Sequence, residues 1–129
     1  MRIFKSKLFH RWARKHQLDD EALVHATKEI KAGLVDADLG GHVFKKRIAT
    51  KGRGKSGSVR TLLAYSQGTR TFYIFAFEKA DKDNISSKEK AAIKLVAHEL
   101  LNLSDKEIEL RIQQNALYEV RKELWTENH

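Results

Sequence analysis

The sequence of 129 residues contains no cysteine and no proline, and it has no long apolar run. Without cysteine, a fold stapled by disulfides and a thiolate nucleophile are both excluded. No apolar segment approaches the roughly 20 residues that cross a bilayer, and the basic N-terminal segment lacks the pattern of a secretory signal. We therefore predict a cytoplasmic protein without a membrane partner.

The segment from residue 42 to residue 60, HVFKKRIATKGRGKSGSVR, contains no acidic residue. It carries seven of the 25 lysines and arginines, and five of the seven glycines lie in it or just before it. Unneutralised cations attract phosphate, and glycines let the backbone approach a ligand closely. The segment therefore predicts a loop that binds a polyanion, while a plainer interpretation is a solvated hairpin loop.

The net charge of +8 is unevenly distributed along the chain. Residues 1–77 hold 16 Lys and Arg against 6 Asp and Glu, which gives +10, whereas residues 78–129 hold 9 against 11, which gives −2. Such asymmetry favours a nucleic acid, a ribosomal surface or an acidic protein segment as partner of the basic half.

Hydrophobic periodicity changes once along the chain. Helical spacing predicts one helix from Lys7 to His16 and a second that begins at Asp19 and Asp20 and ends near Gly33, together a helical hairpin. After a connector over residues 36–41 the period becomes two, and β-branched and aromatic residues predict an antiparallel meander. Its strands are expected over Val43–Ala49, Val59–Ser66 and Thr71–Phe77, with a turn at Gln67 and Gly68.

Two further helices are expected in the C-terminal third. Ser86 and Ser87 are candidate caps for the first, and Ser104 and Asp105 start the second. Residues 116–129 are polar enough to form a flexible tail. The order helix, helix, three strands, helix, helix predicts a single α+β domain over residues 1–129.

Two motifs suggest nucleotide or metal chemistry but fail on their context. ATKGRGKS, residues 49–56, satisfies a relaxed phosphate-loop pattern, yet a strand rather than a helix follows it. His98 begins the string HELLN, where Asn102 stands in place of a second ligand at i+4, so no metal site is expected. His42 is placed for acid or base work, although a structural role is the more common one.

Aromatic residues alternate along the third predicted strand. Phe72, Tyr73, Phe75 and Phe77 are more typical of a sheet core than of a surface on which bases stack. Tyr65 or Tyr73 is the candidate for stacking on a base beside the cations.

The run DLGGHVFKKRIATKGRGKSGSVRTLLAY, residues 38–65, followed by FYIFAFEKADKDNIS, residues 72–86, resembles the RelE/HigB-like toxins of bacterial type II toxin-antitoxin systems. The resemblance covers residues 1–115 in the order of elements. It implies a small basic RNase, a translation inhibitor that acts on mRNA in the ribosomal A site, with a helical pair beside a curved antiparallel sheet. It also implies a cognate antitoxin, often a helix-turn-helix DNA-binding protein, and no cofactor.

The resemblance implies catalytic roles for four cations. Lys45 and Arg47 match alternating cations of the first long strand, Arg60 matches the arginine that begins the next strand, and Lys79 matches the basic residue just past the third. The sequence departs from RelE at Ala80, where RelE has an arginine, and at Ile85 or Ser86, near which RelE has a tyrosine.

Cleavage of RNA by its own 2′-hydroxyl needs a base, an acid and charge stabilisation at phosphorus, and it requires no metal. We expect Arg60 to stabilise the phosphate, because a guanidinium grips two oxygens. RNA binding is expected from Lys51, Arg53, Lys55 and Tyr65. Two other interpretations remain: a nucleic-acid or ribosome-binding module without catalysis, and a ParE-like gyrase inhibitor.

Overall fold

The computed structural model describes residues 1–50, 58–66, 70–79 and 84–120. The predicted glycine-rich loop and the turn at Gln67 and Gly68 therefore lie outside the described residues. In chain order the elements are β1 (Arg2–Ser6), α1 (Lys7–Lys15), α2 (Asp20–Lys31), β2 (Ala37–Gly40), β3 (Val43–Ala49), β4 (Ser58–Ser66), β5 (Arg70–Glu78), α3 (Ser87–Leu101), α4 (Asp105–Gln113) and β6 (Leu117–Glu119).

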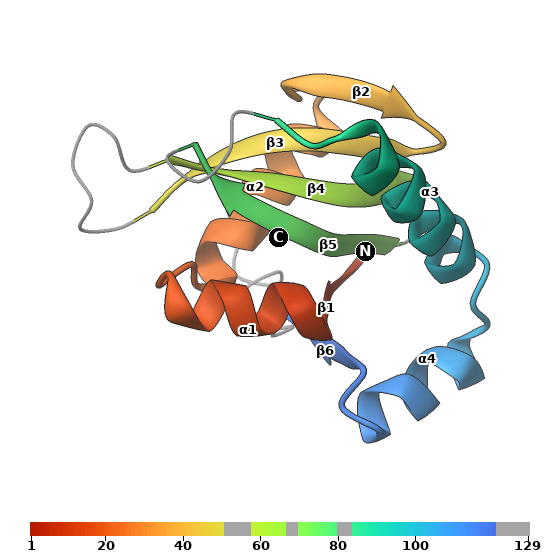
Figure 1. The fold of residues 1–129 in the computed structure, drawn as a ribbon. Coiled ribbons are helices and arrows are strands. Elements are labelled where there is room, and N and C mark those ends of the chain that lie inside the picture. The colour runs from red at the N-terminus through yellow and green to blue at the C-terminus, as the bar shows by residue number, and fades with distance from the viewer. Residues whose placement is uncertain (51–57, 67–69, 80–83, 121–129) are drawn as a thin grey trace.

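The strands form one sheet in the order β2-β3-β4-β5-β1-β6. All neighbours are antiparallel except β1 and β5, which pair in parallel. Figure 1 shows α2 behind the sheet and α3 in front of it. The predicted α+β class is confirmed, and the four predicted helices and the three-stranded meander are all present within one or two residues of their expected bounds.

Two hydrophobic cores lie on opposite faces of the sheet. The first packs α1 and α2 against the sheet through residues that include Phe9, Leu23, Leu63 and Tyr73. The second packs α3 and α4 against the other face through residues that include Phe72, Ile93, Ala97 and Ile108. Consecutive strand residues point to opposite faces, so each strand residue can be assigned to the α1 and α2 face or to the α3 face.

Three predictions about the architecture were incomplete or wrong. The chain begins with β1 rather than a helix, because Ile3 and Phe4 are fully buried in the two cores and pair with β5. The connector over residues 36–41 contains β2. The predicted helical hairpin follows a strand instead of opening the fold, and its helices pack on different strands, α1 on β5 and β1 and α2 on β3.

The predicted C-terminal tail begins with ordered structure. Leu117–Glu119 forms β6 beside β1, and Val120, which is 1% exposed, donates its backbone N–H to the carbonyl of Ile3. Residues 121–129 lie outside the described residues.

The helix starts are the ones that the capping residues predicted. Asp19 accepts the backbone N–H of Ala22 at 2.9 Å at the start of α2. Ser86 and Ser104 each form a complete capping box with the glutamate three residues later, at the starts of α3 and α4. None of the helices within the described residues is long and apolar enough to cross a membrane.

Candidate functional site

Strand β3 sends its cations to both faces of the sheet. Lys46 points to the α2 side, where its ammonium group donates to the carbonyl oxygen of Leu34 at 2.9 Å and lies 3.1 Å from a carboxylate oxygen of Glu29. By the alternation of the strand, Lys45 and Arg47 point to the α3 face. Two of the predicted catalytic cations are therefore on one face, and Lys46 is held on the other.

Strand β4 adds a third cation to that face. Arg60 is paired in register with Arg47 on one side and with Phe77 of β5 on the other. Residues directly opposite in antiparallel strands have Cβ atoms about 4.5–5.5 Å apart, so these three side chains form one continuous row. We name Lys45, Arg47 and Arg60 the cationic face.

A bulge on β5 places aromatic rings beside the cations. The register shifts between Leu62 and Leu63 of β4, which pair with Phe75 and Tyr73, so Ile74 is the extra residue. Phe75 and Phe77 consequently lie on the α3 face, with ring centroids 6.1 Å apart. Phe75 occupies the row of Lys45, and Phe77 the row of Arg60.

Acidic residues outside the basic segment neutralise part of its charge. Asp36, just before β2, accepts the backbone N–H of Arg47 at 2.6 Å and its side-chain Nε at 3.2 Å. Within the described residues no carboxylate pairs with Lys45 or Arg60. The expectation of wholly unneutralised cations is therefore corrected for Lys46 and Arg47.

The cationic face lies at the end of the sheet that α3 does not cover. Figure 1 shows α3 in front of one half of the sheet, while β3, β4 and β5 extend beyond it. Lys45 and Arg60 are half-buried, and Arg47 is more exposed. Lys79 follows β5 by one residue at this end and is exposed. A polyanion can reach Lys45, Arg47 and Arg60 from the same side of the sheet.

The remaining predicted binding residues are not brought to the cationic face within the described residues. Tyr65 lies on the opposite face, half-buried against the core under α1 and α2, with its ring 6.3 Å from that of Phe44. Lys51, Arg53 and Lys55 lie outside the described residues. RNA contact by these four residues stays a prediction.

Tyr73 cannot stack on a base, contrary to one expectation. It is fully buried, and its hydroxyl group shares a hydrogen bond of 2.9 Å with the hydroxyl group of Thr27. Burial raises the pKa of the Tyr73 phenol well above its usual value. The residue stabilises the core beneath α2.

The positions near which RelE carries a tyrosine have structural roles in this chain. Ile85 packs partly against the core under α3, and the side chain of Ser86 accepts the backbone N–H of Glu89 at 3.1 Å as the cap of that helix. Neither supplies a proton-transfer group to the cationic face. Ala80 lies outside the described residues.

His42 lies at the opposite end of β3 from Arg47. His42 precedes β3, so five extended residues, roughly 16 Å, separate it from Arg47. His98 lies on α3 and, with His42, lines a pocket at the other end of the sheet. Among the described residues no group of three or more His, Cys, Asp or Glu side chains could hold a metal ion.

Sequence reasoning missed Asp36 and the aromatic row. Asp36 meets Arg47 only because β2 pairs with β3, and the segment ADLG has the glycine and aspartate that strands usually avoid. Phe77 lies in the sheet core, as expected, but its place beside Arg60 became clear only from the register of β4 and β5. The sequence did contain a signal for this contact. Arg60 lies near the start of one predicted strand and Phe77 at the end of the next, and the alternation of each strand gives the face of its side chains.

The arrangement can bind a phosphate and stabilise negative charge on it. Three cations of neighbouring strands lie on one face of the sheet, beside the aromatic side chains of β5.

Comparison with known proteins identifies one family. A family model described as the RelE toxin of the RelE/RelB toxin-antitoxin system matches residues 1–120. A comparison with curated proteins found no match. The matched span covers every strand and helix that the structure describes.

Proposed function

Since the chain belongs to the RelE toxin family, we propose that it is a ribosome-dependent mRNA endoribonuclease that inhibits translation. Membership makes the protein the toxin of a toxin-antitoxin system, with an antitoxin as its partner. The proposal has three further parts: the protein acts on mRNA, it is cytoplasmic, and residues 1–129 act as one toxin domain.

The observation that carries the proposal is the pairing of Arg47 and Arg60. Like charges directly opposite on neighbouring strands destabilise a sheet, so a stable protein without an anionic ligand gains nothing from them. A phosphate bridging the two guanidinium groups removes the repulsion, because each group can donate two hydrogen bonds to its oxygens.

The proposed chemistry is attack of the 2′-hydroxyl of the RNA on the adjacent phosphorus. The O2′–P bond forms, the P–O5′ bond breaks, and the products are a 2′,3′-cyclic phosphate and a 5′-hydroxyl end. A base takes the proton of the 2′-hydroxyl, and an acid returns a proton to the leaving 5′-oxygen. All atoms of the bond exchange come from the RNA.

We assign the charge stabilisation to Arg60, since Asp36 already engages Arg47. Lys45 and Lys79 are the candidates for proton transfer, from the same end of the sheet. Lys51, Arg53 and Lys55 are proposed to bind the RNA backbone around the scissile phosphate.

The antitoxin is proposed to be a helix-turn-helix DNA-binding protein, as in HigB-like systems. Its binding would place a second protein against the toxin and prevent access to the ribosome. Copurification of the toxin with the product of the neighbouring open reading frame, followed by a DNA-binding assay of the complex, tests both parts of this assignment.

One observation favours a second candidate function, a non-catalytic RNA-binding or ribosome-binding module. Ile85 and Ser86 serve packing and capping, so the tyrosine that RelE carries near these positions has no equivalent there. Such a module would use the cationic face for backbone contacts alone. A ParE-like gyrase inhibitor would instead leave translation intact.

Induced expression in a bacterium, with and without the neighbouring open reading frame, tests the proposed function. The proposal expects arrested translation and new mRNA 5′ ends within reading frames, both suppressed by the antitoxin. Arrested translation without new ends would favour the non-catalytic module, and intact translation with arrested DNA replication would favour gyrase inhibition. Unimpaired growth with folded toxin would contradict all three.

A further inference from the structure

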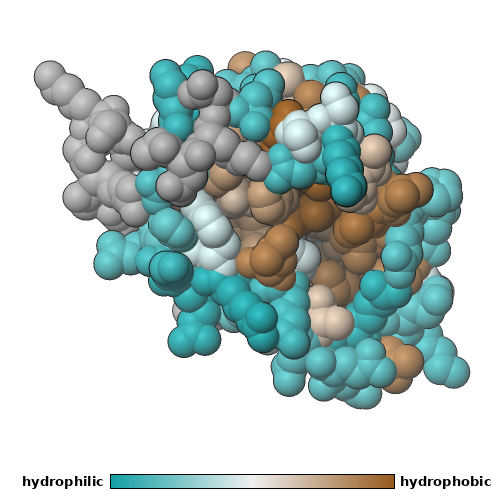
Figure 2. All heavy atoms as spheres, viewed as in Figure 1, coloured by the Kyte–Doolittle hydropathy of each residue, from teal (hydrophilic) through white to brown (hydrophobic). Residues whose placement is uncertain are grey.

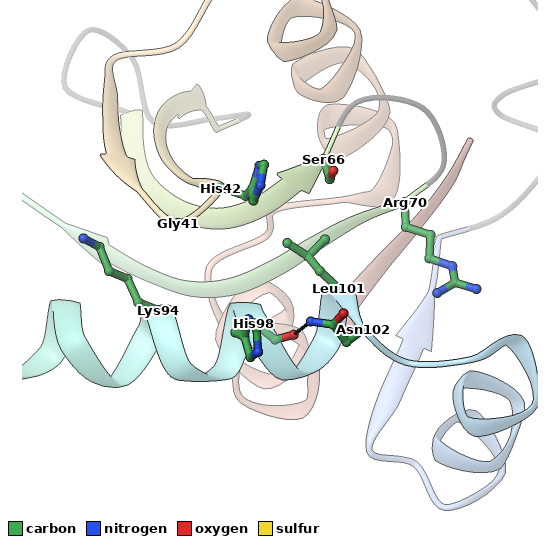
Figure 3. A pocket seen from close by; sticks show the side chains of 8 residues that line it. All are labelled: Gly41, His42, Ser66, Arg70, Lys94, His98, Leu101 and Asn102. Carbon is green, nitrogen blue, oxygen red and sulfur yellow. Dashed lines mark hydrogen bonds between the residues drawn. The ribbon is translucent and has the colours of Figure 1, made fainter.

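Two histidines that the proposed function leaves unused lie in one pocket (Figure 3). The pocket has a volume of about 540 Å³ and lies between α3 and the adjoining ends of the strands. Lys94, His98 and Asn102 line it from α3. His42 and Ser66 line it from the start of β3 and the end of β4.

The geometry of the two sides brings these groups together. Residues four apart on a helix share one face, so Lys94, His98 and Asn102 form a line along α3, as Figure 3 shows. Across from them, Gly41 and His42 form the turn from β2 to β3 with φ values of 63° and 64°. Two positive φ values suit the two-residue hairpin turn that joins β2 to β3.

The turn is held close to α3. A Cβ atom at Gly40 would lie 3.3 Å from the Nζ of Lys94, so the ammonium group rests against the backbone of the turn. The backbone N–H of Tyr65 donates to the carbonyl oxygen of His42 at 2.9 Å, which ties the turn to β4. The pocket is therefore built from fixed elements on both sides.

The charge of the pocket is positive. Among the described residues that line it, none has an acidic side chain. Within the described part of the chain, no carboxylate pairs with His42, Lys94 or His98. Arg70 also borders the pocket, but its guanidinium group turns toward α4, where it pairs with Asp105 and donates to the carbonyl oxygen of Leu103. Arg70 therefore only borders the pocket, and the positive charge that a ligand could meet there is that of Lys94.

We infer that this pocket is a second anion site, separate from the cationic face, and that it holds a backbone phosphate of a single-stranded RNA. Lys94 and His98 line the pocket from α3, His42 from the turn and Ser66 from the end of β4, while the side-chain amide of Asn102 donates to the carbonyl oxygen of His98. A phosphate presents oxygens in several directions and can meet donors from different elements. A carboxylate presents only two oxygens in one plane, so an acidic peptide fits the arrangement less well. Leu101 adds an apolar surface for the ribose or base.

The position of the pocket fits an RNA strand that runs along the sheet. His42 precedes β3, so roughly 10 Å of strand separates it from Lys45 and roughly 16 Å separates it from Arg47. A strand cleaved near Arg60 could extend over α3 into the pocket. The choice of RNA rests on the proposed function, whereas the capacity for phosphate rests on the pocket alone.

The test is a titration of the ¹⁵N-labelled protein, followed by amide NMR, with inorganic phosphate and with a 2′-O-methyl RNA of about 12 nucleotides that cannot be cleaved. We expect the RNA to shift the amides of Gly41, His42 and Asn102 in the parent protein and in Arg60→Ala. Lys94→Ala should weaken RNA binding about fivefold and lower the slope of log affinity against log salt by about 0.7. Lys106→Ala removes the same charge from the exposed side of α4 and should change neither quantity.

Separate reporter amides distinguish this inference from the proposed function. If RNA shifted the amide signals of His42 and Asn102 but not those near Arg60, the RNase proposal would be weakened and the inference about the pocket would be supported. RNA shifts confined to the cationic face would overturn the pocket assignment. It would also be overturned if inorganic phosphate shifted the pocket amides while RNA did not, or if a decamer of glutamate displaced the RNA from Gly41 and His42 at lower concentration.

Discussion

Arg47 and Arg60 lie directly opposite each other on β3 and β4, and Asp36 pairs with Arg47. The sheet therefore carries an unfavourable contact between two like charges. The carboxylate of Asp36, just before β2, offsets part of this repulsion. The contribution of Arg60 to stability, through this repulsion, can therefore be tested separately from its proposed contribution to catalysis.

We predict that Arg60→Ala leaves the free energy of unfolding unchanged or raises it by up to about 0.5 kcal/mol, because it removes the repulsion. Asp36→Ala should lower it by about 0.5–1 kcal/mol, since Arg47 loses its partner. In the Arg60→Ala background the cost of Asp36→Ala should be smaller. Urea denaturation of the four proteins measures the cycle, and simple additivity would show that the two arginines do not interact.

Lys45 and Lys79 should affect the rate more than the affinity. If either transfers a proton, its replacement by alanine should slow single-turnover cleavage on saturated ribosome complexes by about 10² to 10⁴. A lysine that only contacts phosphate should weaken binding instead. Lys106→Ala is the matched control, and unchanged rates at saturation for both variants would reduce these lysines to binding residues.

Tyr73→Phe tests the assignment of this tyrosine to the core. The variant loses the hydrogen bond between the phenol and Thr27, which is buried on both sides. We expect the free energy of unfolding to fall by about 1–2 kcal/mol, because the Thr27 hydroxyl loses a partner. Binding of RNA should not change, and a loss of affinity in the folded variant would return Tyr73 to the interface.

His10 should make stability depend on pH. Its ring stacks on Tyr118 with centroids 3.7 Å apart, and within the described residues its buried Nδ1 makes no hydrogen bond. Burial, with the nearby charges of Lys5 and Arg14, lowers the pKa of His10 below its usual value. The unfolded chain therefore binds the proton more readily, so the contribution of His10 to stability is present above about pH 6.5 and is lost as the pH falls.

Urea denaturation at about pH 7.5 and pH 5.5 checks this expectation, with His10→Gln as the comparison. The parent protein should lose more stability between the two pH values than the variant does. Equal losses would mean that other groups produce the whole pH dependence. The control matters because several acidic residues also begin to titrate at the lower pH.

Strong local patterns made most of the fold predictable from the sequence. Strand β3 was predicted with its observed bounds, because VFKKRIA contains β-branched and aromatic residues and lies between Gly41 and Gly52. The starts of α3 and α4 followed from Ser86 and Ser104, since a capping box is a local motif. These elements need no knowledge of the rest of the chain.

The missed strands depend on distant partners. The segment RIFKS of β1 pairs in parallel with β5, about 70 residues later, and no local pattern reveals such a pairing. Strand β6 has three residues and is stabilised by β1 on one side. The candidate site was also predictable only in part. Its cations could be recognised in the sequence. Their faces, the partner of Arg47 and the pocket around His42 could be seen only once the register of the sheet was known.

Single-turnover cleavage of mRNA on purified, programmed ribosomes tests the central claim most directly. The account predicts cleavage by the parent toxin, with a 2′,3′-cyclic phosphate on the upstream product and a 5′-hydroxyl group on the downstream product. Arg60→Ala should lower the rate by about 10² to 10³, and Arg60→Lys should restore only part of it, because lysine cannot grip two oxygens. No cleavage by folded parent toxin, or equal rates for the parent and Arg60→Ala at saturation, would contradict the account.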